Sequence, residues 1–300
     1  MRHAITGISC VAARKNQEFV CLEELMHRAL EDSKVKIADH NRDNIGIFLG
    51  TTFSNFYIRK NNFDKLNKLT KSDVRRINPA DFPKLLISYL GGCVSIKFGT
   101  KGALSVLSSG QASGLDALHQ ALFFLQRNKK NIAFVIDLDE NWHKNKASSA
   151  KSGVCFVCES ISSQSPIKVY ADILRVENFF EKKNKNSGLC KCLKKTLEFC
   201  SSQKAMPQYF YSSQIRGSKK YALEQKALSC IFADKKFKLM PAKTVTNSSL
   251  RAVYDNIKQQ RLCPWPENLA VSLFLNIGEN ANSSCVTIGS SQGAKMTTNR

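Results

Sequence analysis

Cysteine and acidic side chains are the groups in this sequence whose types and spacing could do chemistry. Cys155 and Cys158 form a CxxC pair, and Asp137, Asp139 and Glu140 follow an apolar run. The sequence has no second CxxC and no Cys/His quartet of the kind a structural zinc site needs. Because residues three apart on a strand point to opposite faces, the pair is predicted to be buried hydrophobic side chains. The acidic group could be an acid/base pair or a metal site, or could satisfy the end of a strand.

Histidine, the commonest general acid and base, is confined to the first half of the chain. The five histidines are His3, His27, His40, His119 and His143. No residue after position 143 can therefore supply an imidazole. The Ser108–Ser109 pair could suggest a serine nucleophile, but no G-x-S-x-G elbow accompanies it. His119 lies in a run of helical spacing and is interpreted as a structural histidine.

Size and charge restrict the class of protein. The 300 residues are 43% hydrophobic, enough for a large core, and the longest apolar runs are too short for a membrane span. Eleven cysteines without an export signal favour reduced thiols and a cytoplasmic location, with no membrane partner. The net charge of +21 favours anionic partners, either nucleic acid or an acidic carrier protein. Nucleic acid is disfavoured because no RRM, KH, zinc-finger or helix-turn-helix signature is present.

Apolar strand-like runs alternate with amphipathic helical runs along the whole chain. The first half has strand patterns at 4–12, 44–51, 103–107, 131–138 and 154–159, and helical patterns at 21–32, 78–91 and 114–127. A weaker version of the same order follows, which predicts a duplicated α/β fold. We expect an N-terminal half at 1–160, a C-terminal half at 167–289 and a flexible tail at 290–300, with the Ser/Pro-rich segment 160–166 as the seam.

Segments of the first half resemble β-ketoacyl synthases in order. The residues that carry this resemblance are ITGIS at 5–9, IGIFLGT at 45–51, RRINP at 75–79, GCVSIKFGTKG at 92–102 and SVLSSGQASGLDAL at 105–118. The resemblance implies a thiolase-like duplicated αβαβα layered fold, shortened relative to ordinary ketosynthases. Position 111 is where that family carries its catalytic cysteine, on a strand-to-helix elbow whose helix N-terminus stabilises a thiolate.

Gln111 stands at the nucleophile position of this elbow. An amide cannot attack a thioester as a thiolate does, so no acyl-enzyme can form there. Gln followed by ASGLDAL is similar to chain-length factors, which are non-condensing subunits that pair with an active ketosynthase. The resemblance therefore implies that the chain has no catalytic residue of its own.

The two histidines that ketosynthases use for decarboxylation and carbonyl polarisation are also missing from the positions that the resemblance indicates. The first falls at Ser213 or Gln214, and the second falls at Ser248. Lys243 aligns with a lysine of the family and is expected to be structural or to assist a carboxylate. We therefore expect no cofactor and no metal bound by this chain.

The resemblance further implies a heterodimer with a ketosynthase in polyketide, aryl-polyene or fatty-acid-like biosynthesis. Its substrates would be carried on the phosphopantetheine arm of an acyl carrier protein. The residues implied to pair with the partner or shape its acyl tunnel are Ala103, Leu104, Ser105, Val106, Leu107, Ser108, Gln111, Leu115 and Leu118. Two alternatives remain open: a malonyl-carrier decarboxylase of the Gln type, which the missing histidines oppose, and a homodimeric module that binds acyl carriers.

Overall fold

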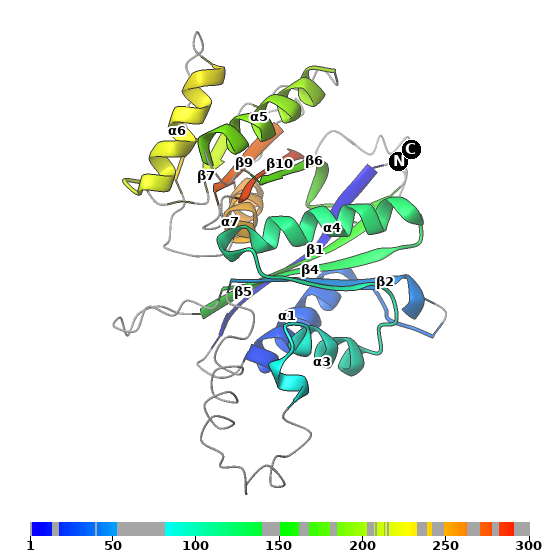
Figure 1. Ribbon diagram of the computed structural model, residues 1–300. Helices are drawn as coiled ribbons and strands as arrows, with labels where there is room; N and C mark the ends of the chain where they lie inside the picture. The colour runs from blue at the N-terminus through cyan, green and yellow to red at the C-terminus, as the bar shows by residue number, and fades with distance from the viewer. Residues whose placement is uncertain are drawn as a thin grey trace, which may run out of the picture.

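The strands of the first half form a mixed sheet that ends at a free edge (Figure 1). The computed structural model describes residues 2–13, 18–39, 41–52, 82–139, 151–161, 168–180, 185–202, 207, 209–212, 214, 216–232, 239–241, 249–262, 271–277 and 282–290. The strands are β1 (Arg2–Ala13), β2 (Ile45–Thr51), β3 (Leu104–Leu107), β4 (Ile132–Asp139) and β5 (Lys151–Ile161). Their order is β3-β2-β4-β5-β1, with β2 parallel to β3 and β4, and with β5 antiparallel to β4 and β1.

The second half repeats this topology strand for strand. Its strands are β6 (Ala171–Phe180), β7 (Tyr209–Ser212), β8 (Leu239–Met240), β9 (Val271–Ile277) and β10 (Asn282–Ser290). Read from the outer edge, the order is β8-β7-β9-β10-β6, and the parallel and antiparallel pairings match those of the first half. The two halves join where His3–Ile5 of β1 pairs antiparallel with Ala171–Ile173 of β6. The fold is therefore the predicted duplication.

Helices occupy corresponding places in the two halves. They are α1 (Glu18–Ser33), α3 (Tyr89–Phe98), α4 (Ser113–Arg127), α5 (Lys185–Ser202), α6 (Lys219–Ile231) and α7 (Ser249–Leu262). The described residues also form the short 3-10 turns η1 (Arg42–Asn44), η4 (Pro83–Leu85) and η5 (Gly110–Ala112). Element order therefore makes α1, α3 and α4 the counterparts of α5, α6 and α7.

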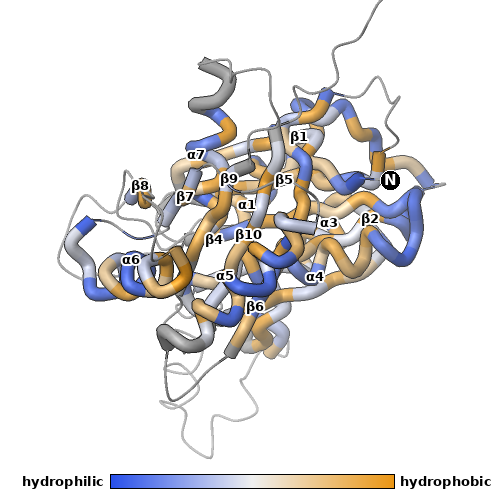
Figure 2. The backbone as a smooth tube through the Cα atoms, turned by 90° about the horizontal axis from the view of Figure 1, so that it is seen from above, coloured by the Kyte–Doolittle hydropathy of each residue, from blue (hydrophilic) through white to orange (hydrophobic). Residues whose placement is uncertain are grey.

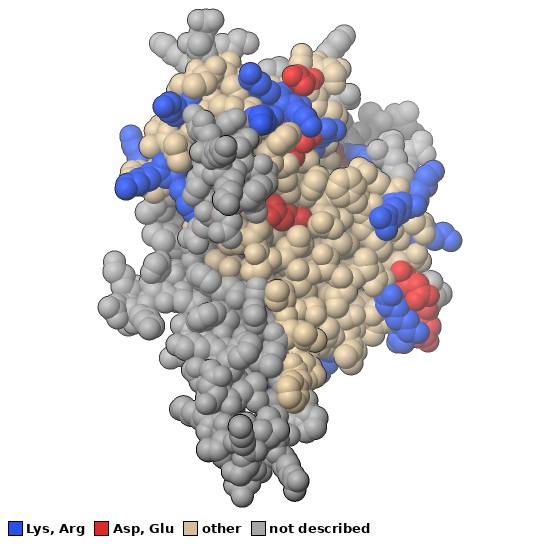
Figure 3. All heavy atoms as spheres, viewed as in Figure 1, with Lys and Arg blue, Asp and Glu red and all other residues tan. Residues whose placement is uncertain are grey.

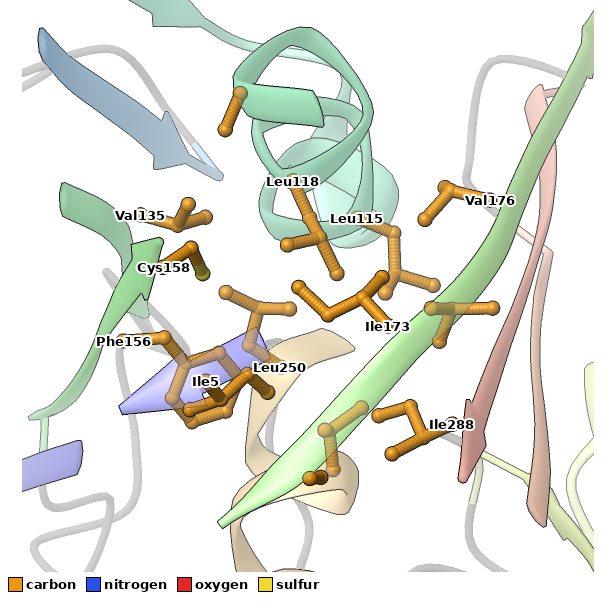
Figure 4. Close-up of a cluster of buried hydrophobic side chains, with 14 of the residues drawn as sticks. Ile5, Leu115, Leu118, Val135, Phe156, Cys158, Ile173, Val176, Leu250 and Ile288 are labelled. Carbon is orange, nitrogen blue, oxygen red and sulfur yellow. The ribbon is translucent and has the colours of Figure 1, made fainter. Parts of the chain in front are cut away.

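Three buried clusters establish the αβαβα layers. The first-half and second-half strands form one ten-stranded sheet, and we call its two halves the first and second sheet. In the central cluster, Leu115 and Leu118 of α4 pack with Leu250 of α7 between these halves (Figure 4). A second cluster packs α1 and α3 against the outer face of the first sheet, and a third packs α5 and α6 against the outer face of the second. Figure 2 shows hydrophobic segments along the strands and alternating hydrophobic and hydrophilic segments along α4 and α6, as burial of one helix side requires.

The predicted helix at 78–91 is wrong over residues 82–88, which form no α-helix, and at its C-terminal end. The structure starts α3 at Tyr89 and continues it through Gly91 and Gly92 to Phe98, whereas the sequence pattern treated this glycine pair as a helix stop. A Cβ on Gly91 would lie 2.8 Å from the side chain of Val106, so glycine allows α3 to approach β3. The helix ends instead at Gly99, whose φ of 65° is the left-handed conformation that favours glycine.

The predicted seam and tail fall largely outside the described residues. Strand β5 ends at Ile161 and β6 begins at Ala171, and residues 162–167 between them are not described. Ser290 is the last residue of β10, and the rest of the predicted tail is not described. The boundaries 1–160 and 167–289 therefore stay predictions.

Candidate functional site

The elbow between β3 and α4 is held against the end of β2. Gly110 has a φ of 69°, which allows the sharp turn after β3. The hydroxyl of Ser113 donates to the carbonyl oxygen of Thr51 at 3.0 Å and accepts from the amide of Ser109 at 2.9 Å. A Cβ on Gly50 would lie 2.5 Å from the backbone of Ser113, so only glycine lets the elbow sit this close to β2.

Gln111 is the middle residue of η5, and Ala112 separates it from Ser113, the first residue of α4. Its side-chain oxygen Oε1 accepts a hydrogen bond from Lys220 Nζ at 2.5 Å and lies 3.5 Å from Gln214 Nε2. Lys220 comes from the first turn of α6, which is 109 residues away in sequence. Sequence patterns did not identify Lys220, because a lysine near a helix N-terminus carries no signal for a contact this distant.

Gln214 is one of the two positions suggested for the first missing histidine. Its side chain is 7% exposed, and its backbone amide donates to the hydroxyl of Ser212 at 2.8 Å. The Ser212 hydroxyl in turn donates to the carboxylate of the fully buried Glu224. These two hydrogen bonds fix the turn between β7 and α6 beside the elbow. The other position, Ser213, lies outside the described residues.

Asp137 links the elbow to α7: it lies against Gly114 of α4 and accepts a hydrogen bond from α7. It ends the apolar part of β4, is 1% exposed, and accepts the backbone amide of Leu250 at 3.0 Å. Ser249 Oγ lies 3.4 Å from the same carboxylate oxygen and accepts the amide of Leu115 at 3.0 Å. A carboxylate at the first turn of α7 satisfies helix amides, so the structure favours the structural role for Asp137.

The remaining predicted site residues fall on undescribed segments. Ser248, the position suggested for the second histidine, precedes Ser249 but lies outside the described residues, as do Lys243 and Glu140. Asp139 is described only as the last residue of β4. Among the described residues, no group of three or more His, Cys, Asp or Glu side chains could hold a metal ion.

Asp116 is a half-buried carboxyl group that sequence patterns did not identify. It lies in the first turn of α4, where it accepts from Ser109 Oγ and, at 2.8 Å, from Asn178 Nδ2 of β6. Burial raises the pKa of Asp116, while the bonds from Ser109 and Ser284 lower it in part. The Ser109 hydroxyl is thereby engaged by a carboxylate.

His119 and the Cys155/Cys158 pair, which were interpreted from the sequence as structural, make packing contacts. His119 stacks edge-on against Phe123, with ring centroids 4.7 Å apart, and burial lowers its pKa. Cys155 and Cys158 are both fully buried, in the outer and the central cluster respectively, so they lie on opposite faces of β5 as predicted. Burial raises the pKa of both thiols.

Strand β3 is the edge of the sheet and pairs only with β2 in the described part of the chain. Ala103 joins this pairing through its carbonyl oxygen, which accepts the amide of Ile47 at 2.8 Å. Leu104 is 40% exposed, and Ser105, Val106 and Leu107 are half-buried. The site residues Leu115 and Leu118, by contrast, lie in the central core, and Ser108 is exposed beside the elbow.

Exposed apolar side chains lie in α3, which packs against β3, and in the segment that precedes α3. They are Phe82, Leu86, Ile87 and Ile96, and Ile96 of α3 is 84% exposed. In the view of Figure 3, Lys and Arg side chains gather over α5 and α6, and few charged side chains lie over the middle of the molecule. An unpaired edge strand with apolar neighbours is the kind of surface that pairs with another chain.

The helices show no membrane-spanning segment in the part of the chain that the structure describes. Nothing at the described elbow offers a nucleophile at position 111, since an amide group occupies it. The arrangement can hold and orient polar groups by hydrogen bonds, but Gln111 cannot form a covalent acyl intermediate.

Comparison with solved structures reveals the same fold along almost the whole chain. The ishigamide ketosynthase/chain length factor is 13% identical, with a TM-score of 0.72 over 97% of this chain and 99% of that chain. The AntDE:AntF complex, a type II PKS acyl-carrier protein with its ketosynthase, is 13% identical, with a TM-score of 0.71 over 96% and 99%. A β-ketoacyl synthase from Burkholderia phymatum is 13% identical, with a TM-score of 0.72 over 96% and 99%.

Sequence comparison agrees for the first half. None of the curated proteins compared matches the chain. The family model for the β-ketoacyl synthase N-terminal domain matches residues 3–147, which include the elbow and Gln111. The duplicated strand topology agrees with this match, because the solved ketosynthase structures share this fold along almost the whole chain.

Proposed function

We propose that this chain is a non-condensing, chain-length-factor-like subunit that pairs with an active ketosynthase in the cytoplasm. The observation that carries the proposal is Gln111 at the elbow, with its side-chain oxygen bonded to Lys220. A ketosynthase fold that keeps its elbow but has an amide in place of a thiolate can support a partner, but cannot accept an acyl group at that position.

The free edge of β3 supports pairing with another ketosynthase-fold chain. Its backbone groups face outward on one side, and Leu104 and Ile96 expose apolar surface beside them. Antiparallel pairing across this edge would satisfy the strand's free amides and carbonyls and would bury the apolar neighbours. The partner's acyl tunnel would then run close to the elbow and α4.

The outer helices of the second half support a carrier protein as the further partner. The exposed basic residues of these helices are Lys191, Lys194, Lys195, Lys219 and Lys226; together with Arg216, which precedes α6, we call them the α5–α6 basic face. Glu198 is the exposed acidic residue in the described parts of these two helices. Such a face attracts an acidic protein, and the substrates proposed are acyl groups on the phosphopantetheine arm of that carrier.

Co-purification with candidate ketosynthases tests the proposal. The tagged chain is expressed with each ketosynthase encoded beside its gene, and complexes are analysed by size exclusion and mass spectrometry. We expect a one-to-one complex, with product formed only when both chains are present. Leu104→Asp should abolish the complex, while Val20→Asp, at a more exposed apolar site on α1, should leave it intact.

Other outcomes would replace the proposal. If the chain forms a homodimer and binds none of the ketosynthases, the result would favour the homodimeric module that binds acyl carriers. Release of carbon dioxide from malonyl-carrier by the isolated chain would favour the decarboxylase. A specific complex with nucleic acid that survives high salt would reject both acyl-carrier readings, because non-specific binding of polyanions weakens steeply with salt.

A further inference from the structure

Lys220 lies near the N-terminus of α6, where a positive charge is unfavourable for the helix. It is in the first turn of α6, which has no acidic residue and is capped by Ser218, whose hydroxyl accepts the amide of Tyr221 at 3.1 Å. The N-terminus of a helix is the positive end of its dipole, so a cation there costs about 0.3–1 kcal/mol. Helix stability therefore gives no reason for this lysine.

The neighbouring lysine provides the contrast. Lys219 occupies the same turn and is exposed, whereas Lys220 is half-buried and its Nζ donates to Gln111 Oε1. Gln214 is 7% exposed, and its side-chain nitrogen Nε2 lies 3.5 Å from the same oxygen of Gln111. Two donors from the β7–α6 region thus converge on one atom of the elbow.

We propose that Lys220 replaces the absent imidazoles as the cationic hydrogen-bond donor to position 111. It is a positioning residue: it fixes the Gln111 amide and makes the elbow electropositive, so that position 111 favours an oxygen or an anion. In the native chain the oxygen is that of Gln111, which keeps this elbow occupied internally. The inference relies on the proposed function only in treating position 111 as a non-nucleophilic elbow.

Three carboxyl groups near the elbow act in the opposite direction. Asp116 lies in the first turn of α4, Asp137 is next to Gly114, and Glu224 faces the β7–α6 turn through Ser212. A negative charge disfavours a second one nearby, so these groups would raise the pKa of any acid at position 111. The inference is that the Lys220 ammonium outweighs these carboxyl groups, because it bonds directly to the side chain at position 111.

The ionisation of a cysteine placed at position 111 measures this effect directly. We compare Gln111→Cys alone, with Lys220→Met, and with the matched control Lys219→Met. Alkylation by iodoacetamide is followed against pH, and site-resolved peptide mass spectrometry separates the new thiol from the eleven native cysteines. Because an opposite charge within about 4–6 Å shifts a pKa by about 1–3 units, Lys220→Met should slow alkylation near pH 7 about tenfold or more.

The control variants make the outcome decisive. Lys219→Met should leave the alkylation profile unchanged, and Lys220→Arg should preserve it because the guanidinium is also cationic. Equal profiles with and without Lys220 would overturn the inference. If a cysteine variant fails to fold, a double-mutant cycle of Gln111→Ala and Lys220→Met on thermal stability replaces it, and additive effects would then reject the bond.

This test is separable from the test of the proposed function. Alkylation is measured on the purified chain, or on its complex if the chain needs a partner to fold. A chain that pairs with a ketosynthase but shows no dependence on Lys220 rejects the inference alone. A chain that depends on Lys220 but pairs with no ketosynthase rejects the proposed function alone.

Discussion

The backbone amide of Leu115 donates to the hydroxyl of Ser249 at 3.0 Å, across 134 residues of sequence. This bond satisfies an amide in the first turn of the elbow helix with a side chain from the first residue of α7. Since the first amides of a helix have no partner within the helix, the second half of the chain caps the elbow of the first. The two halves are therefore coupled at the site itself.

Removing this cap should weaken the fold. We predict that Ser249→Ala lowers the free energy of unfolding by about 1–2 kcal/mol, because the buried amide of Leu115 loses its acceptor. Chemical denaturation monitored by circular dichroism measures the change. Ser229→Ala on the exposed side of α6 serves as the control and should change stability by less than about 0.5 kcal/mol. Equal effects of the two variants would contradict the capping role.

Two glycines should respond oppositely to alanine. A Cβ on Gly114 would lie 2.2 Å from a carboxylate oxygen of Asp137, so Gly114→Ala should destabilise the protein by several times the effect of an ordinary surface substitution. Gly92 lies in α3 with nothing within 4 Å of its Cβ position, so Gly92→Ala should stabilise the protein by about 0.5–1 kcal/mol. Thermal unfolding of both variants tests the pair, and stabilisation by Gly114→Ala would refute the packing at the elbow.

Restoring a thiol at position 111 should not restore condensation. We predict that the Gln111→Cys chain, without a ketosynthase partner, forms no condensed product from acyl and malonyl carriers. The reason is that no histidine follows residue 143, so the malonyl group finds no imidazole in the second half. Product analysis by mass spectrometry tests this, with an active ketosynthase as the positive control. Condensation by this variant would show that other groups can do the work of the histidines.

Stability should depend on pH through Asp116. Burial raises the folded-state pKa of this carboxyl above its unfolded value, so the folded state holds the proton more tightly. Its contribution to stability is fully present below the unfolded pKa and is lost as pH rises through the folded pKa. We predict that Asp116→Asn removes this part of the pH dependence, so that the variant gains stability relative to the native chain as pH rises from the unfolded pKa through the folded pKa.

Denaturation at a series of pH values measures this difference. Asp39→Asn is the control, because the Asp39 side chain is 90% exposed. Native and Asp39→Asn chains should show parallel curves. A curve for Asp116→Asn that also runs parallel would mean that Asp116 is not protonated more readily in the folded state.

The α5–α6 basic face should contribute to carrier binding. We predict that Lys194→Glu with Lys226→Glu weakens binding of an acidic acyl carrier protein to the complex, and that the native affinity falls with added salt. Lys129→Glu, an exposed charge reversal after the end of α4, is the control. Binding by surface plasmon resonance that is unchanged by the double variant would place the carrier elsewhere.

Local patterns in the sequence were enough for the elements and their order. The apolar spacing of 114–127 predicted the elbow helix, which the structure places at Ser113–Arg127, because one buried side of a helix repeats every three to four residues. Alternating strand and helix runs predicted the duplication, which the matching strand orders confirm. The same reasoning failed at Gly91 and Gly92, where close packing on Val106 outweighs the low helix propensity of glycine.

The sequence by itself determined which chemistry is absent. Residue identity is sufficient to exclude a thiolate at position 111 and imidazoles after residue 143, whatever the fold. Only the tertiary structure shows which side chains from the second half contact the elbow. Lys220 and Ser249 reach the elbow from more than 100 residues away, through the packing of α6 and α7 against the two sheets. Such contacts leave no local pattern, because they depend on how the halves pack and not on the spacing of residues along either one.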